Sequence, residues 1–164
     1  MAGSESGANR TRHERFVKLV VDASVVIKWF AIEELRPEAR RLEPLIDHLV
    51  APDFLLIELS NIAWKKIRQG MLQPDDAAWI TSHLRCSGMR LLPSEPLLDA
   101  ALSLAQEFDH PVYACLYVAS MDLLGAAFVT WDKPLHAKLA RSRFAALAYL
   151  LSDVDRLLVD LGTA

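Results

Sequence analysis

The sequence has little cysteine and no long hydrophobic run. Its 164 residues include only Cys86 and Cys115, whose separation fits neither a CxxC pair nor the Cys/His spacing of a zinc site. We therefore expect two reduced thiols in a cytoplasmic protein. No apolar run approaches the roughly 20 residues that a membrane-spanning helix needs, so we expect no membrane association.

An excess of charge of one sign is absent as well. The formal net charge is -3, so the chain has no overall basic character that would attract nucleic acid. Nucleic-acid binding would therefore need a local basic patch or phosphates bridged by a metal. Basic side chains that could contact phosphates stand at Lys28, Lys65, Lys66, Arg68 and Lys133, although most such side chains in proteins are solvated surface.

The length and composition indicate one compact domain. The chain is long enough for a single sizeable core, and 52% hydrophobic against 24% charged residues is not the composition of a disordered protein. Residues 1–14 are rich in Ser, Gly and Arg and lack the apolar core of a signal peptide, so we expect a disordered leader there. The domain is predicted over 15–152, and 153–164 is a tail or short helix. No repeat or linker divides it.

The hydrophobic pattern predicts strands that alternate with helices. The predicted strands are 19–22, 90–92 and 126–130, with 50–52 extended and 145–151 as a candidate edge strand. A helix is entered near Ser24, and others are expected at 54–69 (capped by Asp53), 74–85, 96–108, 112–124 and 134–140. The polar stretch 33–41 is expected to continue as a helix to about residue 48, and 153–161 has a weak helical pattern. This alternation predicts a mainly parallel sheet with helices on both faces.

Three acidic residues stand at unusual places in this pattern. Asp22 and Asp132 each end a predicted strand, and Glu58 is the only charge between Phe54 and Trp64. Because the carboxyl ends of parallel strands lie at one edge of a sheet, Asp22 and Asp132 can converge there. The plainer interpretations are that Asp22 caps a helix beside Ser24, and that Glu58 reaches solvent or an arginine at the edge of its apolar stripe.

Convergence of these acids would favour a metal site. Clustered carboxylates repel one another and need a cation or a proton in order to coexist. Ligands that are all oxygen favour Mg²⁺ or Mn²⁺ over Zn²⁺. A site of this kind activates water and stabilises the leaving oxygen when a phosphodiester is hydrolysed.

Four segments resemble the motifs of PIN-domain ribonucleases, particularly VapC-type toxins. They are VVDASVVIKWF at Asp22, APDFLLIELSNIAWK at Glu58, HPVYACLYVA at Ala114 and VTWDK at Asp132, in matching order over residues 17–140. The resemblance implies an α/β fold, the PIN-like three-layer sandwich, with a central mainly parallel sheet of four to five strands and helices on both faces.

The resemblance also implies an activity and partners. It implies a Mg²⁺- or Mn²⁺-dependent endoribonuclease acting on RNA, and a VapB-like antitoxin that inserts a C-terminal segment. The assembly would be a homodimer or a toxin–antitoxin hetero-oligomer. By position, Asp22, Glu58 and Asp132 would be catalytic and metal-binding, with Ser24, Asn61 and Thr130 as polar supports. An apolar groove beside the acids would receive the partner, and Trp29, Phe30, Trp64 and Trp79 are candidates to line it.

The third motif departs from the family pattern at Ala114, where an Asp is expected directly after the tyrosine. Loss of that carboxylate removes a metal ligand or the holder of a metal-bound water, so we expect activity to be lost or weakened. Asp109 and Asp122 are the nearest acids, and neither is expected to restore the site. Ala114 is either an introduced inactivating change or a natural degeneration, and the intact motifs around it favour the first.

Two other functions fit parts of the pattern. A catalytically degenerate PIN domain could bind antitoxin or RNA without cleaving, and this is the main alternative. A haloacid-dehalogenase-like phosphatase also uses an Asp at the end of a strand. That class needs a second Asp two residues later, where this chain has Ser24, so it is disfavoured.

Overall fold

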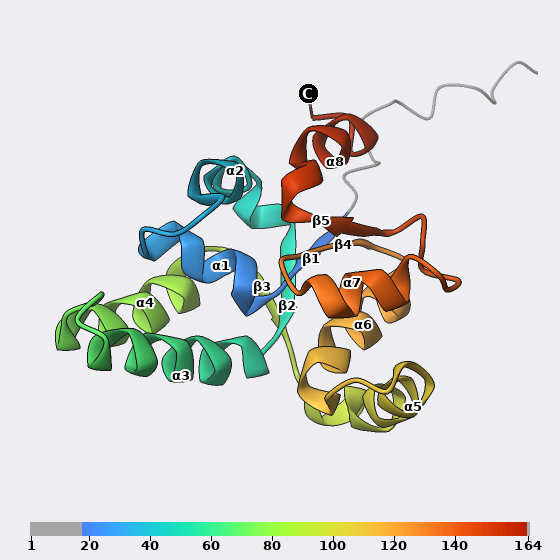
Figure 1. Ribbon diagram of the computed structural model, residues 1–164, viewed down its shortest axis with the longest axis horizontal. Helices are drawn as coiled ribbons and strands as arrows, with labels where there is room; N and C mark the ends of the chain where they lie inside the picture. Colours follow the sequence, from blue (N-terminus) through green and yellow to red (C-terminus); the bar gives the residue numbers. More distant parts are fainter. Residues whose placement is uncertain (1–17, 164) are drawn as a thin grey trace, which may run out of the picture.

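A five-stranded parallel sheet forms the centre of the protein (Figure 1). The computed structural model describes residues 18–163, so the leader expected at 1–14 lies outside the described residues. The strands follow the order β3-β2-β1-β4-β5, and every neighbouring pair is parallel. Their bounds are β1 Leu19–Val21, β2 Leu49–Pro52, β3 Arg90–Leu92, β4 Ala127–Thr130 and β5 Ala148–Leu150.

Helices cover both faces of this sheet, which gives the three-layer sandwich expected from the sequence. Figure 1 shows α1 (Ala23–Phe30), α3 (Phe54–Arg68) and α4 (Pro74–Cys86) on one side. On the other side lie α5 (Leu98–Phe108), α6 (Val112–Leu124) and α7 (Lys133–Leu139). The remaining helices are α2 (Arg36–Arg40) and α8 (Val154–Asp160), with 3₁₀ turns at Glu43–His48, Glu95–Leu97 and Leu151–Asp153.

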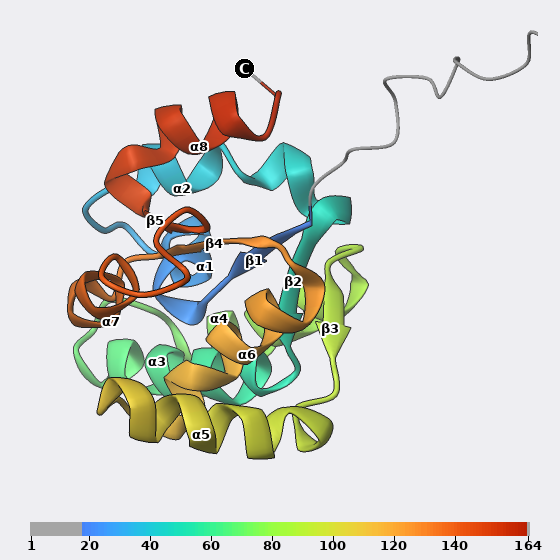
Figure 2. The ribbon, with the colours of Figure 1, turned by 90° about the vertical axis from the view of Figure 1, so that its right-hand side faces the viewer.

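Helix α6 is the most deeply buried of these elements. It packs against β1, β2 and β4, and α5 packs in turn against α6 (Figure 2). Every residue from Ala114 to Met121 is therefore buried. This explains why the helix is apolar nearly all round, a pattern typical of a helix enclosed by protein. Within residues 18–163, no helix is long and apolar enough to cross a membrane.

Two local expectations were wrong. The segment 33–48 is not one continuous helix, because α2 ends at Arg40 and a 3₁₀ turn follows from Glu43. Pro44 accounts for the break, since its ring lacks an N–H and clashes with the preceding helical turn. Asp53 precedes α3 but its side chain does not cap it. The carboxylate of Asp53 instead accepts hydrogen bonds from the backbone N–H of Ser94, at 3.1 Å, and from the Ser94 hydroxyl.

An ion-paired cluster ties α1 to α3. Lys28 on α1 and Lys66 on α3 are only 4% and 8% exposed, and both donate to the carboxylate of Glu33 in the loop after α1. The Lys28 Nζ lies 3.2 Å from Glu33 Oε2. Burial by itself would raise the pKa of Glu33, but the hydrogen bonds and charges of the two lysines hold it below its ordinary value. These two lysines are thus committed inside the protein, and the expectation that they contact phosphates was wrong.

We expect Glu33→Gln to lower the free energy of unfolding by about 3 kcal/mol, because it leaves two buried ammonium groups without a counter-charge. Urea denaturation measures this loss. Glu34→Gln is the matched control, because its side chain is exposed and its effect should stay within about 0.5 kcal/mol. Equal losses in the two variants would show that the cluster does not stabilise the fold.

Candidate active site

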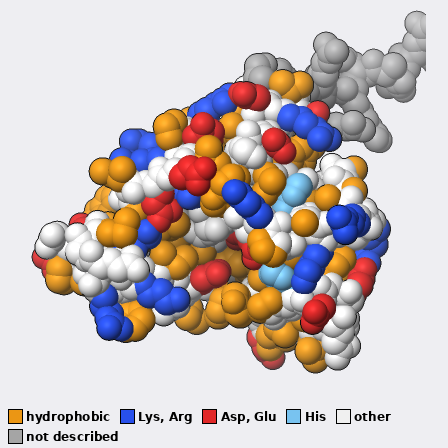
Figure 3. Space-filling model, viewed as in Figure 1, with side chains coloured by type: hydrophobic (Ala, Val, Ile, Leu, Met, Phe, Trp, Pro, Cys, Tyr) orange, Lys and Arg blue, Asp and Glu red, His pale blue; other side chains and the backbone are white. Residues whose placement is uncertain are grey.

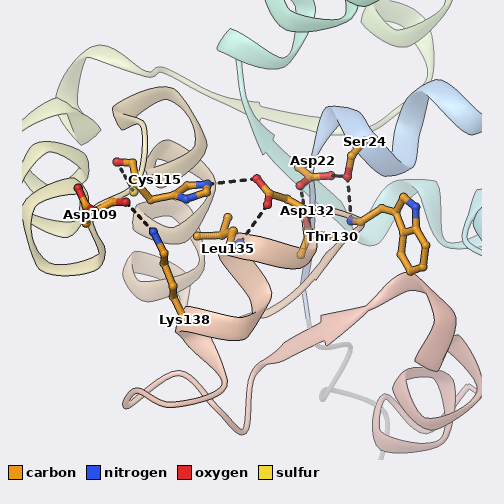
Figure 4. Close-up of polar contacts among 10 residues, drawn as sticks. Asp22, Ser24, Asp109, Cys115, Thr130, Asp132, Leu135 and Lys138 are labelled. Atoms are coloured by element: carbon orange, nitrogen blue, oxygen red, sulfur yellow. Dashed lines mark hydrogen bonds and ion pairs between the residues drawn. The ribbon is translucent and has the colours of Figure 1, made fainter.

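The three acids picked out in the sequence are brought to one edge of the sheet. Asp22 directly follows β1, and Asp132 lies two residues after β4, the strand that pairs with β1. Figure 4 shows these two carboxylates side by side, at the N-termini of α1 and α7. Glu58 projects from α3 on the other side of β1, and its charge acts on Asp22. The sheet edge thus carries three carboxylates from three separate elements.

Two hydroxyl groups hold the carboxylate of Asp22. The Ser24 hydroxyl donates to Oδ1 at 2.5 Å, and the Thr130 hydroxyl donates to Oδ2. Each hydroxyl also accepts from the backbone after β4: Ser24 from the N–H of Trp131 at 2.8 Å, and Thr130 from the N–H of Asp132 at 2.9 Å. The side chain of Asp22 is thereby fixed to both β1 and β4 (Figure 4).

The surroundings of Asp22 favour its protonated form. Burial is the largest effect and raises the pKa of Asp22 from 3.8 to about 7, and the nearby charge of Glu58 acts in the same direction. The hydrogen bonds from Ser24, Thr130 and the backbone of Val25 lower it only in part. Because Asp22 also caps α1 by accepting from the Val25 N–H at 3.3 Å, the capping interpretation holds together with convergence on the other acids.

Glu58 has a partner that the sequence reasoning missed. The Tyr117 hydroxyl, from α6, donates to Glu58 Oε2 at 2.7 Å. Burial raises the pKa of Glu58, the Tyr117 hydrogen bond lowers it in part, and the charge of Asp132 raises it further. A sequence signal existed, because Tyr117 is a hydroxyl-bearing side chain in an otherwise apolar stretch of α6. That signal did not identify which acid it would contact.

Asp132 is held at both oxygens. Oδ1 accepts from the Leu135 N–H at 2.9 Å and so caps α7. Oδ2 lies 3.1 Å from Nε2 of His110, which appeared in the sequence only as the first residue of the third motif, with no role assigned to it. The side chain of Asp132 is 31% exposed, whereas Asp22 is buried, so Asp132 is the more accessible of the two strand-end acids.

The polar residues expected to support these acids lie at different distances from them. Ser24 and Thr130 contact Asp22 directly. Asn61 is exposed on α3, one turn after Glu58. The structure gives it no hydrogen bond to Asp22, Glu58 or Asp132 among the described residues.

Ala114 lies on α6 between the two contacts just described. It is 8% exposed, one turn before Tyr117 and four residues after His110. The acids considered as substitutes point to other partners. Asp122 is exposed, and its carboxylate lies 3.9 Å from Arg143. Asp109 ends α5 with a positive φ of 47°, and its carbonyl accepts from Lys138 at 2.5 Å.

The donor chemistry of the site fits a hard divalent cation. The candidate ligands are carboxylates, and two of them have pKa values raised by burial and by neighbouring negative charge. Within residues 18–163, no group of three or more His, Cys, Asp or Glu side chains is close enough to form a complete ligand set. Mg²⁺ is commonly held by one or two carboxylates and several waters. The arrangement therefore suits a cation that keeps much of its water.

An aromatic pocket of about 310 Å³ opens at the other end of α1. Phe30 meets Trp79 edge to face with ring centroids 5.5 Å apart, and Trp79 stacks on His83 at 4.9 Å. Trp64 does not line this pocket and instead lies beneath Arg68, 5.1 Å away. The pocket is lined by Trp29, Phe30, Ile46, Trp79, His83 and Leu84, with Arg40, Glu43 and Ser87.

Acidic and hydrophobic side chains adjoin in the hollow at the middle of the face in Figure 3, and Lys and Arg side chains lie around it. Of the basic residues singled out in the sequence, Lys65 and Arg68 line a shallow pocket of about 250 Å³ with Gln69. Lys133 lies 4.4 Å above the ring of Trp131. These three cations remain at the surface, unlike Lys28 and Lys66.

Comparison with known proteins agrees with this architecture. A model of the PIN domain matches residues 19–142. Ribonuclease VapC3 from Pyrobaculum aerophilum is 30% identical over 124 residues, which span 74% of this chain and 95% of that protein. The crystal structure of PAE2754 from Pyrobaculum aerophilum superposes with a TM-score of 0.66 at 24% identity, over 90% of this chain and 98% of that one. This second likeness bears on the fold alone.

The raised pKa of Asp22 has a consequence for stability. Between about pH 4 and pH 7 the metal-free folded state keeps a proton that the unfolded chain has lost, so stability falls as the pH rises through this range. Asn cannot ionise, so we expect Asp22→Asn to remove that loss. At about pH 8 the free energy of unfolding of the variant should exceed that of the parent by up to about 4 kcal/mol. Urea unfolding in EDTA measures the difference.

Asp122→Asn is the matched control for this experiment, since Asp122 is an exposed acid whose carboxylate lies 3.9 Å from Arg143. It should leave the pH dependence as it is in the parent. If Asp22→Asn also retained the full loss of stability between the two pH values, ionisation of Asp22 could not be its cause.

Proposed function

The chain belongs to the PIN-domain family of VapC-type ribonucleases, and we propose that it is a metal-dependent endoribonuclease toxin whose activity is weakened by Ala114. The observation that carries this proposal is the meeting of Asp22, Glu58 and Asp132 at one sheet edge. There the charge of Glu58 contributes to the raised pKa of Asp22, and the charge of Asp132 contributes to the raised pKa of Glu58. We assign the domain to residues 15–152 and the protein to the cytoplasm, where its two free cysteines would stay reduced.

Asp22, Glu58 and Asp132 would hold the cation, either Mg²⁺ or Mn²⁺, in part through its bound water. When bound, such an ion activates water and stabilises the leaving oxygen of the phosphodiester. The ion would also offset the burial and the neighbouring negative charge that raise the pKa values of Asp22 and Glu58. Ser24 and Thr130 keep Asp22 in one orientation, so the site is rigid before the substrate arrives.

Glu58 is the acid best suited to move a proton, because both oxygens of Asp22 and both oxygens of Asp132 already take part in hydrogen bonds. Tyr117 occupies only Oε2, which leaves Oε1 to accept a proton from the attacking water. The more exposed Asp132 is placed to meet the substrate at the surface.

RNA phosphates would contact the basic side chains that remain at the surface. Lys65 and Arg68 lie on α3 beyond Glu58, and Lys133 directly follows Asp132. Because Lys28 and Lys66 are engaged with Glu33, they do not take part. The overall charge of -3 makes these local contacts the source of attraction for RNA.

One observation favours the alternative of a degenerate PIN domain that binds antitoxin or RNA without cleaving. Among the described residues, no three metal-ligating side chains form a close group, and Ala114 contributes only a methyl group where the family motif has a carboxylate. A site with this defect could keep the shape that binds antitoxin or RNA but lose the ability to cleave RNA.

Restoring the acid separates the two functions. We expect Ala114→Asp to raise Mn²⁺-dependent cleavage of tRNA or rRNA by about 100-fold, because the loss of one group that holds a metal or its water commonly costs 10- to 100-fold. Gel assays of purified RNA measure the rate. Ala114→Asn, which has the same shape without the charge, should gain far less. If Ala114→Asp gains neither cleavage nor Mn²⁺ affinity, the chain is a binding module.

We further propose that the aromatic pocket receives the C-terminal segment of a VapB-like antitoxin, in a homodimeric or toxin–antitoxin hetero-oligomeric assembly. Apolar anchors buried in aromatic pockets carry much of the energy of such contacts. The pocket has Arg40 and Glu43 at its lining, which would pair with polar groups at the edge of the inserted segment.

Trp79→Ala should weaken binding of the co-encoded antitoxin by about 30-fold, the usual effect of truncating a central interface residue. Calorimetric titration measures the dissociation constant. Trp64→Ala provides the comparison, because Trp64 is similarly exposed (50% against 56%) but lies outside the pocket. Equal weakening by both substitutions would argue that the segment binds elsewhere.

A further inference from the structure

Two of the three acids are held by side chains from a single stretch of chain. Tyr117 on α6 donates to Glu58, which belongs to α3, at 2.7 Å. His110, two residues before α6, lies 3.1 Å from Asp132, which belongs to the β4–α7 turn. Neither acid is carried by α6. The stretch 110–117 therefore spans the site and contacts the acids of two other elements.

This stretch is fixed from several directions. Tyr117 is 2% exposed on a helix enclosed between the sheet and α5. The loop around His110 is tied to α6 by the Cys115 thiol, which donates to the His110 carbonyl at 3.8 Å. It is tied to α7 by Lys138, which donates to the carbonyl of Asp109 (Figure 4). Because its surroundings are rigid, the stretch can impose an orientation on the acids that it contacts.

The contact at Asp132 sets the rotation of the carboxylate. An ionised carboxylate only accepts hydrogen bonds, so Nε2 of His110 carries the hydrogen in this contact. With the Leu135 N–H on Oδ1 and His110 on Oδ2, both oxygens have a defined place. At Glu58, Tyr117 fixes Oε2 alone, and the Tyr117 hydroxyl also lies within the field of Asp22. The two contacts thus fix the rotation of both carboxylates.

We propose that Tyr117 and His110 are positioning residues of the nuclease site, and that through one hydrogen bond each they orient Glu58 and Asp132. The proposal rests on the proposed metal-dependent function. Ala114 lies between them in the sequence, on the same helix as Tyr117. The stretch that lacks its own acid therefore still sets the geometry of the others, so we expect a single substitution at Ala114 to be enough to restore the site.

Mn²⁺ affinity in the Ala114→Asp chain tests the proposal. Outer partners of metal ligands typically contribute 10- to 100-fold to metal affinity, so Tyr117→Phe and His110→Phe should each weaken Mn²⁺ binding by about 10-fold or more. His110→Gln can still donate from a nitrogen near the Nε2 position, and it should recover most of the affinity. Calorimetry or electron paramagnetic resonance titration gives the dissociation constants.

Tyr113→Phe is the matched control for Tyr117→Phe. It removes the same hydroxyl from the same helix, but Tyr113 is half exposed and packs near Phe54. Its Mn²⁺ affinity should equal that of the parent. Thermal unfolding of every variant separates positioning from stability. Variants of His110 or Tyr117 that unfold at lower temperature but bind Mn²⁺ unchanged would overturn the proposal, and so would failure of His110→Gln to recover affinity.

A second measurement needs no metal. Nitrogen-15 NMR of the unsubstituted chain should show His110 with hydrogen on Nε2, and Asp132→Asn should shift that signal. Hydrogen on Nδ1 alone would overturn the proposal for His110. If the Ala114→Asp chain binds no Mn²⁺ at all, the proposed metal-dependent function fails, while the NMR result still decides whether His110 and Asp132 are coupled.

Discussion

The buried carboxylate of Asp22 is the constraint on which the rest of the site depends. It is 6% exposed and lies where β1 ends and α1 begins. Burial of a charge without compensation costs several kcal/mol, and here two hydroxyls that are themselves bonded to the backbone after β4 compensate this cost only in part. The same contacts that lower the cost of burying Asp22 also join β1 to β4 at the edge where the acids meet.

Much of this arrangement was predictable because it depends on local pattern. Strands that end at Asp22 and near Asp132 follow from short apolar runs, and the parallel order of the sheet brings them together. The elements missed were those decided by distant contacts. Asp53 does not cap α3, because its carboxylate accepts hydrogen bonds from Ser94, about forty residues away. Nothing near Glu33 in the sequence indicates that it pairs with Lys66.

The partners of the acids were hidden for the same reason. His110 and Tyr117 stand within a recognisable motif, but their contacts with Asp132 and Glu58 cross from one element to another. One error was avoidable, since Pro44 is a local signal that the helix expected at 33–48 would break. Local rules therefore identified the acids, whereas the tertiary structure determined which oxygens are held and which remain available for chemistry.

The length of helix α1 sets the distance between the acids and the aromatic pocket. Asp22 caps its N-terminus, and Trp29 and Phe30 at its C-terminus line the pocket. Its eight residues span about 12 Å, and an extended peptide covers that distance in about four residues. The distance from the pocket to the acids is therefore within the reach of a short extended peptide. One such segment, if it followed that direction, could occupy the pocket and obstruct the site together.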